Sequence, residues 1–255
     1  MKILLTNDDG IHAEGLWALE RALSKDHNVC VVAPDKERSA IGHSITLLNP
    51  LRVNRIETNG GCGYAVTGTP ADCVKLAIVE ILDGAPDLVV SGINPGANVG
   101  INLNYSGTVS AAKEGALLGV PGLAVSKDPP FAGEYDFAAR FVRHLVKKIS
   151  ENRLAPYTFL NVNFPGCPSK EIRGVRITRQ GTAPLISQQG GFHKRLDPRN
   201  QVYYWQGMER QAFETQTDSD GAALDEKWIS ITPVKCDMTD HDAMQVLETW
   251  KIELS

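Results

Sequence analysis

The chain has no feature that ties it to a membrane, to a polyanion or to an oxidising compartment. No apolar run is long enough to cross a bilayer, and the N-terminus enters a short apolar segment instead of a secretion signal. The five cysteines are scattered and contain no C-x-x-C pair, so their spacing indicates neither a disulfide framework nor a zinc site. A formal net charge of −4 offers no surface for gripping the backbone of a nucleic acid. We therefore expect a cytoplasmic protein that binds neither membranes nor nucleic-acid polymers.

Internal repeats and low-complexity tracts are also lacking, and the composition is that of an ordinary globular protein. Of the 255 residues, 42% are hydrophobic and 22% are charged, which is ample for a buried core. Apolar runs that predict strands alternate with helical patterns through the first two-thirds of the chain, the strands being expected at 3–5, 27–33, 87–91, 123–126 and 160–164. This alternation predicts an α/β fold with a doubly wound, mostly parallel sheet.

Two patterns in the middle of the chain interrupt this alternation. Residues 45–57 and 64–67, joined through Asn59-Gly60, predict an excursion of antiparallel strands. The run Thr69-Pro70-Ala71-Asp72 predicts a helix start, because it offers an N-cap hydroxyl, a proline at the first helical position and an acid in the first turn.

The pattern changes beyond about Arg179, where regular periods become sparse. Strands that look isolated are predicted at 202–205 and 228–234, a closing helix at 240–250, and polar irregular segments at 181–200 and 207–227. We therefore expect residues 1–180 to form the core. Residues 181–255 are expected to form an arm, not an independent domain, that extends the core or packs on another subunit.

Two adjacent carboxylates, Asp8 and Asp9, directly follow the first predicted strand. The turn Asn7–Gly10 carries them beyond the carboxyl end of that strand, which is where ligands of open α/β sheets bind. Two neighbouring carboxylates repel each other unless a cation or a shared proton lies between them. A solvated turn is the alternative interpretation, because aspartate and glycine are common in turns.

Oxygen-bearing side chains follow two other predicted strands and are expected at the same edge of the sheet. The loop after residues 27–33 carries Ser39 and His43, and the loop after residues 87–91 carries Asn94. Carboxylate, amide and hydroxyl oxygens are hard ligands that suit Mg²⁺ or Mn²⁺. Taken singly, Ser39 fits a loop hydroxyl and Asn94 fits a turn residue. Their convergence with the acid pair favours a metal site.

Backbone N–H groups are expected beside this metal site. They come from a glycine-rich loop that includes Asn98 and from a turn at a helix N-terminus formed by Ser106, Gly107 and Thr108. Such amides form a ready site for an anion. A cation beside an anion cradle predicts a phosphate ester that bridges the two.

The motifs that carry these groups resemble those of one protein family, in order and over nearly the whole chain. They are LLTNDDG followed by Gly15, VVAPDKERSAIGHSIT, GTPADCV, VVSGINPGANVG, YSGTVSAAKEG and SITP. The set resembles the SurE family of metal-dependent survival-protein nucleotidases of bacteria and archaea. Two places depart from the family pattern, namely Pro95, where a small residue is usual, and Lys227-Trp228, where Gly-Tyr is usual. The second departure bears on how the arm packs.

The resemblance implies a fold, an activity and a set of ligands. Members of the family are 5′(3′)-nucleotidases that hydrolyse nucleoside monophosphates, with some activity on short polyphosphate. They have a Rossmann-like catalytic core and a C-terminal arm exchanged between subunits of a homodimer or homotetramer. They use one divalent cation in each subunit, here expected to be Mg²⁺ or Mn²⁺. Carried over to this chain, the metal ligands are Asp8, Asp9, Ser39 and Asn94.

The resulting hypothesis is a metal-assisted hydrolysis of a phosphomonoester, in which metal-bound water attacks in line. The expected catalytic residues are Asp8, Asp9 and Asn94, with one aspartate also orienting the water. The phosphate oxygens would be held by groups of Asn98, Ser106, Gly107 and Thr108.

Three other functions fit parts of this pattern. A phosphoaspartyl phosphatase needs its acids spaced as Asp-x-Asp, whereas here the two acids are adjacent. A receiver-like regulatory module needs a phosphoacceptor aspartate where Gly68-Thr69-Pro70 stands, and only about half of this chain length. A passive nucleotide-binding protein is the third alternative. The roles of His43 and of Tyr105, the nearest candidate for stacking on a base, are open.

Overall fold

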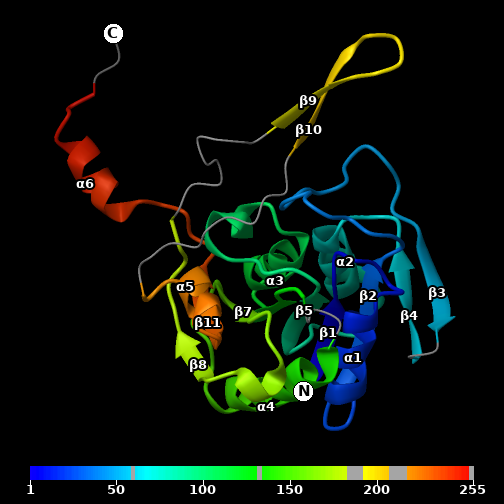
Figure 1. The fold of residues 1–255 in the computed structure, drawn as a ribbon. Helices are drawn as coiled ribbons and strands as arrows, with labels where there is room; N and C mark the ends of the chain where they lie inside the picture. Colours follow the sequence, from blue (N-terminus) through cyan, green and yellow to red (C-terminus); the bar gives the residue numbers. More distant parts are fainter. Residues whose placement is uncertain (59–60, 131–133, 183–191, 207–216, 253–255) are drawn as a thin grey trace.

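A nine-stranded, mostly parallel sheet forms the centre of the molecule in the computed structural model (Figure 1). The structure describes residues 1–58, 61–130, 134–182, 192–206 and 217–252. The strands lie in the order β3-β4-β2-β1-β5-β6-β7-β11-β8, and β10 and β9 form a separate two-stranded sheet. The strands are β1 (Lys2–Thr6), β2 (Asn28–Pro34), β3 (Val53–Thr58), β4 (Gly61–Val66), β5 (Leu88–Asn94), β6 (Gly122–Lys127), β7 (Thr158–Phe164), β8 (Gly174–Ile177), β9 (Phe192–Leu196), β10 (Val202–Gln206) and β11 (Trp228–Lys235).

Helices cover both faces of the large sheet, with α1 and α4 on one face and α2 and α3 on the other. The α-helices are α1 (Glu14–Leu23), α2 (Pro70–Leu76), α3 (Gly107–Leu117), α4 (Tyr135–Glu151), α5 (Asp220–Asp225) and α6 (His241–Glu248). One π-helical segment, η1 (Ala77–Ile81), and two 3-10 segments, η2 (Gly100–Asn104) and η3 (Ser169–Glu171), complete the chain path. Within the described ranges, no helix is both long and apolar enough to traverse a membrane.

The apolar side chains of β1 contact helices on both faces of the sheet. Ile3 and Leu5 point to the face covered by α1 and α4, whereas Leu4 points to the face covered by α2. All three side chains are at most 1% exposed. Burying each of them stabilises the fold by roughly 1.5–3 kcal/mol. A strand buried on both faces has a continuous apolar run instead of an alternating one, as this N-terminal segment does.

The predicted α/β class with a mostly parallel sheet is confirmed. The neighbouring strands from β4 through β2, β1, β5 and β6 to β7 all run parallel. The expected antiparallel excursion consists of β3 and β4, with Val53 opposite Val66. The turn predicted at Asn59-Gly60 lies outside the described residues. The predicted helix start at Thr69 is also confirmed, because its hydroxyl and the Asp72 carboxylate form a capping box.

The isolated strands and irregular segments predicted for the C-terminal part of the chain are wrong in part. The strand predicted as isolated at 228–234 is β11, which pairs antiparallel with β7 and parallel with β8. Its partner β7 is distant in the sequence, so no local pattern reveals the pairing. Part of the segment predicted as irregular at 181–200 is β9, which pairs with β10, the strand predicted as isolated at 202–205. The segment predicted as irregular at 207–227 contains α5, a helix of only six residues. All five residues of β9 are exposed, and so the strand lacks the period-two burial that would identify it.

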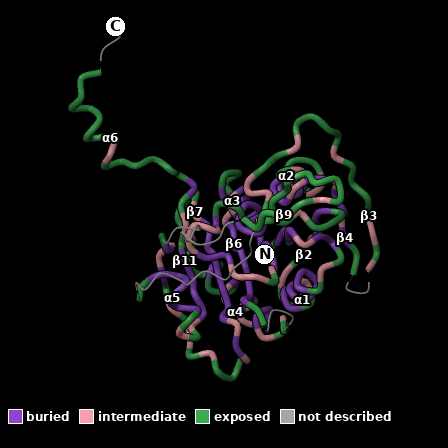
Figure 2. Tube along the Cα trace, turned by 45° about the horizontal axis from the view of Figure 1, so that its top comes forward, coloured by how far each residue is buried: buried purple, intermediate pink, exposed green. Residues whose placement is uncertain are grey.

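Two parts of the C-terminal segment project from the large sheet. The β9–β10 hairpin extends on one side, and α6 leads away on another (Figure 1). Figure 2 shows α6 as mostly exposed, in contrast to the buried strands at the centre. Of the residues described in α6, none is buried. The helix predicted at 240–250 therefore forms at the predicted place but does not pack on the sheet of its own chain.

A buried aspartate, Asp220, joins this C-terminal segment to the glycine-rich loop after β5. Asp220 begins α5 and is 0% exposed. Its carboxylate accepts backbone hydrogen bonds from Gly100 at 2.9 Å, from Gly181 at 3.0 Å and from Gly221 at 2.8 Å. The side chain of Gln180 also donates to the Gly100 carbonyl at 2.9 Å. Gly100 is thereby fixed by the beginning of the C-terminal segment.

We predict that Asp220→Ala lowers the free energy of unfolding by about 2–3 kcal/mol, because it leaves three backbone N–H groups, two of them in buried residues, without this acceptor. The matched control is Asp218→Ala, which removes an exposed ion pair with Arg179 (3.0 Å). Loss of that pair is expected to cost less than about 1 kcal/mol. Urea unfolding of both variants measures the difference, and equal losses would contradict the role assigned to Asp220.

Candidate functional site

The carboxyl ends of β1, β2 and β5 form one rim of the sheet, and most of the predicted site residues lie in the loops that follow these strands. The loop after β1 is closed by Asn7. Its side chain accepts a hydrogen bond from the Gly10 N–H at 3.2 Å and donates one to the Gly10 carbonyl at 3.0 Å. This turn holds Asp8 and Asp9 at the end of the strand, as the sequence predicts.

Asp8 is buried against the N-terminus of α3. Its Oδ1 accepts a hydrogen bond of 2.5 Å from the hydroxyl of Thr108. Gly107 permits this close approach, since a Cβ at position 107 would lie 2.7 Å from the Cβ of Asp8. The backbone N–H of Arg38 donates to the Asp8 carbonyl at 2.7 Å. Three segments distant in sequence, namely the β1 and β2 loops and the start of α3, therefore meet at Asp8.

Asp9 carries a strongly perturbed carboxyl group. Burial raises its pKa to about 7, and the negative charges of Asp8 and Glu37 contribute to the rise. Burial also raises the pKa of Asp8, although hydrogen bonds with Thr108 oppose the increase. The Oδ2 atom of Asp9 is buried and has no hydrogen-bond partner among the described residues. A bound cation would satisfy such an oxygen and relieve the repulsion between the two carboxylates.

Glu37 is a third acid at this rim, and the sequence analysis missed it. Its negative charge raises the pKa of both Asp8 and Asp9. Its Oε1 accepts a hydrogen bond of 2.5 Å from the hydroxyl of Ser39 and so orients that predicted ligand. Ser39 is exposed to solvent. The sequence does place this acid two positions before Ser39. The same loop also contains Asp35, Lys36 and Arg38, so nothing in its pattern distinguishes Glu37 from an ordinary solvent-exposed charge.

Asn94 is the last residue of β5, the strand next to β1. Its Nδ2 donates a hydrogen bond of 2.6 Å to the Gly96 carbonyl. This bond fixes the side-chain amide, and so the remaining polar atom, Oδ1, is the one that can bind a cation. Pro95 is exposed and leaves this arrangement intact.

Asn98 is buried in a network formed with the ends of β6 and β7. Its backbone N–H donates to Oδ1 of Asn163 at 2.8 Å, and its Nδ2 donates to the Ser126 hydroxyl at 2.9 Å. Its carbonyl accepts a hydrogen bond of 2.8 Å from the side chain of Asn161. A side-chain amide nitrogen has two protons, so the hydrogen bonds among the described residues leave one N–H of Asn98 for a ligand.

Ser106 caps the N-terminus of α3, which begins at Gly107. Its hydroxyl accepts a hydrogen bond of 3.1 Å from the Val109 N–H, and its carbonyl accepts one of 2.6 Å from the Ser110 hydroxyl. The first N–H groups of a helix lack intrahelical acceptors and form the positive end of its dipole. The predicted phosphate turn is therefore a helix N-terminus that lies against Asp8.

His43 fastens the loop that carries Ser39 to α3. Its Nε2 lies 2.7 Å from Oε2 of Glu114, and the neighbouring Gly42 N–H donates to the Tyr105 carbonyl at 3.0 Å. The side chain of Tyr105 is 56% exposed. His43 thus has a partner in the protein.

In the parts of the chain that the structure describes, no three His, Cys, Asp or Glu side chains are grouped to hold a metal ion. The predicted ligand set is of another kind, because a hydroxyl and a carboxamide join its two carboxylates. The structure brings Asp8 into contact with Thr108 and links Ser39 to the acid pair through Glu37. Asn94 belongs to the same rim through the pairing of β5 with β1.

Comparisons with known proteins agree with this fold and this set of motifs. A family model described as Survival protein SurE matches residues 3–186. A protein named 5′-nucleotidase SurE from Desulfatibacillum aliphaticivorans is 58% identical over 254 residues, covering 99% of each chain. Another of that name from Syntrophus aciditrophicus is 52% identical, covering 97% of this chain and 93% of its own. A crystal structure of the SurE protein from Aquifex aeolicus superposes with a TM-score of 0.82 and 36% identity, covering 99% of this chain and 100% of its own. The chain belongs to the SurE family.

Proposed function

We propose that this protein is a metal-dependent 5′-nucleotidase, a phosphomonoesterase that hydrolyses nucleoside 5′- and 3′-monophosphates as well as short polyphosphate. Its relatives carry the name 5′-nucleotidase, and their similarity extends over the whole chain. The observation that carries the proposal is the buried Oδ2 of Asp9, which has no hydrogen-bond partner among the described residues and adjoins Asp8, the acid held at the N-terminus of α3. This arrangement offers a site for a cation directly beside a site for an anion.

The donor atoms at the rim fit one hard divalent cation, Mg²⁺ or Mn²⁺, in each subunit. The proposed ligands are Asp8, Asp9, Ser39 and Asn94. Two carboxylates supply two negative charges, and the hydroxyl and carboxamide oxygens are hard neutral donors. Burial, followed by the negative charges of Asp8 and Glu37, raises the pKa of Asp9 to about 7, and a bound cation would favour its charged form. When bound, the cation would polarise phosphoryl oxygens and acidify a water molecule.

The protein's own groups bind and orient the other reactants. Asp8 is held by Thr108, so we assign the water-orienting role to Asp9, whose Oδ2 has no partner among the described residues. The start of α3, with Ser106 as its cap and Gly107 and Thr108 in its first turn, provides the positive end of the helix for the phosphate oxygens. The hydroxyl and the backbone N–H of Thr108 also bind Asp8, so the Gly107 N–H is the amide offered to the phosphate. The free N–H of Asn98 adds a side-chain donor. Donors held in advance stabilise the charge that develops in the transition state.

We also propose that residues 181–255 act as an oligomerisation arm on the catalytic core of residues 1–180, joining subunits into a homodimer or homotetramer. The support comes from exposed apolar side chains on β9, β10 and the α6 region, namely Phe192, Leu196, Val202, Tyr203, Tyr204, Trp205, Met244, Val246, Leu247 and Trp250. An isolated hairpin and a short isolated helix are marginally stable in water. A neighbouring subunit would cover these surfaces.

The first prediction tests metal dependence. Purified protein is expected to release phosphate from AMP with Mn²⁺, to lose this activity in EDTA and to regain it when Mn²⁺ is restored. Asp8→Ala is expected to lower both kcat and Mn²⁺ affinity, because one of the two carboxylates is lost. Phosphate release and Mn²⁺ calorimetry provide the measurements. Near-normal turnover by Asp8→Ala would refute the ligand assignment, and binding of AMP without hydrolysis would indicate a passive nucleotide-binding protein.

A second prediction separates phosphate binding from metal binding. Asn98→Ala is expected to lower kcat/KM for AMP by about 10- to 100-fold, as loss of a preorganised donor does. Its Mn²⁺ affinity should stay that of the wild type. Ser126→Ala is the matched control, since it removes the hydrogen bond to Asn98 but leaves the other N–H of that amide. An equal loss of activity in both variants would mean that Asn98 acts only through its hydrogen bond with Ser126 and does not itself bind the phosphate.

A third prediction follows from the raised pKa of Asp9. Between its ordinary value of 3.8 and about 7, the folded protein keeps a proton that the unfolded chain has released. The contribution of Asp9 to stability therefore falls as the pH rises through this window. At pH 8 in EDTA, we expect Asp9→Asn to raise the free energy of unfolding by on the order of 2 kcal/mol, allowing for the partial exposure of the carboxylate.

Thermal unfolding of the same variant with Mn²⁺ provides the control for this stability measurement. Mn²⁺ should raise the Tm of the wild type, because a ligand that binds only the folded state stabilises it. The increase should be much smaller for Asp9→Asn. A variant that is less stable than the wild type in EDTA at pH 8 would show that Asp9 is not under strain from its neighbours.

A further inference from the structure

We propose that the pocket between α1 and the start of α4 binds the nucleoside part of the substrate, with Tyr135 as the aromatic surface for the base. This inference rests on the proposed nucleotidase function. It adds the location of the leaving group, which is the nucleoside. It makes side chains on the α1–α4 face of the sheet responsible for substrate choice, whereas the phosphate is held from the α3 face.

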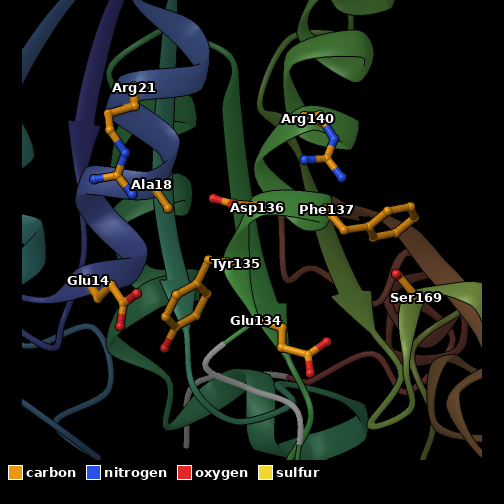
Figure 3. A pocket seen from close by; sticks show the side chains of 9 residues that line it. All are labelled: Glu14, Ala18, Arg21, Glu134, Tyr135, Asp136, Phe137, Arg140 and Ser169. Carbon is orange, nitrogen blue, oxygen red and sulfur yellow. The ribbon is translucent and has the colours of Figure 1, made fainter.

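The position of the pocket is the first argument. Figure 3 shows Tyr135 between the two helices, with the side chain of Glu14 nearby. Glu14 is the first residue of α1, which follows the loop that carries Asp8 and Asp9, so the pocket begins near the carboxyl end of β1. Burial raises the pKa of Tyr135, and the negative charges of Asp9 and Glu14 contribute to the rise. The pocket has a volume of about 360 Å³. That volume lies in the range of roughly 300–1,000 Å³ that is typical of small-molecule sites.

The chemistry of the lining is the second argument. Carboxylates of Glu14, Glu134 and Asp136 can accept hydrogen bonds from ribose hydroxyls. Guanidinium groups of Arg21 and Arg140 can donate to the edges of a base and stack on its face. Carboxylates outnumber guanidinium groups here, so this lining opposes a second phosphate group. The pocket therefore suits a neutral group that is rich in hydrogen-bonding atoms, which describes a nucleoside. The further phosphate groups of a short polyphosphate substrate would lie outside this pocket.

The two aromatic residues of the pocket have different roles. The ring of Phe137 packs edge-to-face on Phe164, with 6.2 Å between the centroids, and so belongs to the core. Tyr135 is half-buried, and its ring lies between α1 and α4 at the pocket (Figure 3). Aromatic side chains that bind bases without sequence preference do so by stacking, which every base allows. Tyr135 can fulfil this role in a pocket whose other wall, α1, follows the loop that carries the proposed metal ligand Asp9.

Tyr105 is the competing aromatic residue, because it directly precedes the phosphate turn at Ser106. Its carbonyl is engaged by Gly42, but its side chain is 56% exposed. A side chain this exposed lacks the surrounding walls that Tyr135 has in the pocket between α1 and α4. We therefore assign base binding to Tyr135, and the comparison of the two tyrosines decides the question.

The experiment measures two quantities in each variant of the full-length protein. The first is the ratio of kcat/KM for AMP to kcat/KM for methyl phosphate, which has no nucleoside. The second is the affinity for adenosine, measured by calorimetry without any hydrolysis. The variants are Tyr135→Ala, Tyr135→Phe and Tyr105→Ala, with Tyr157→Ala as the matched control. Tyr157 is 60% exposed and lies just before β7, at the amino end of the parallel strands.

We expect Tyr135→Ala to lower both the ratio and the adenosine affinity by about tenfold or more, the effect of losing one stacked base. Tyr135→Phe should retain most of the affinity, since the ring is kept. Tyr105→Ala and Tyr157→Ala should leave both quantities unchanged. If Tyr135→Ala does not fold, Arg140→Ala provides the test, because this exposed residue lines the same pocket and should lower adenosine affinity severalfold.

The inference is overturned if adenosine binds Tyr135→Ala and wild type equally, if it does not bind the wild type, or if Tyr105→Ala causes the loss instead. These results are distinct from failure of the proposed function. A wild-type protein that hydrolyses neither ester but binds adenosine through Tyr135 would refute the nucleotidase proposal and support the pocket. A protein that hydrolyses both esters, with a ratio of the two kcat/KM values that Tyr135→Ala leaves unchanged, would support the nucleotidase proposal and refute the role of the pocket.

Discussion

Two carboxylates held side by side and largely away from water are the constraint around which this site is built. Burial and mutual repulsion make the second negative charge unfavourable, which is why the pKa of Asp9 rises to about 7. Asn7 closes the turn that presents the pair, and the Thr108 hydroxyl holds Asp8 in place. The fold thus maintains an electrostatic conflict that a hard dication would resolve. Buried like charges of this kind are typical of functional sites, where the protein gives up some folding stability to bind a ligand.

The sheet divides the proposed substrate between its two faces. On one face, α3 directs its N-terminus at Asp8, and Gly107 allows the helix to approach closely. On the other face, α1 and α4 leave a pocket whose walls are mostly charged. The acid pair lies at the carboxyl end of β1, an inner strand of the sheet, in the loop that leads to α1. This is the location expected for ligands of an open α/β sheet, since the loops at the strand ends reach both layers of helices.

Much of this arrangement could be predicted from the sequence because its signals are local. Strands buried on both faces have short apolar runs, and Asp8 and Asp9 directly follow one of them. Contacts between distant segments were not predictable in this way. Glu37 becomes notable only when its loop folds beside Asp9, and Tyr135 only when α4 packs next to α1. Likewise β11 pairs with a strand far away in the chain, and β9 is exposed throughout.

Asp220 has a consequence for how distant parts of the chain influence each other. One carboxylate binds amides from the glycine-rich loop and from both ends of the segment that includes the β9–β10 hairpin. If that segment joins subunits as proposed, and if association and phosphate binding both favour the arrangement in which Asp220 makes these bonds, association of the subunits and binding of phosphate are thermodynamically coupled. Reciprocity then requires that substrate tighten the association between subunits by the same factor by which association tightens substrate. Dilution alone would weaken affinity for the nucleotide, although no residue of the active site had changed.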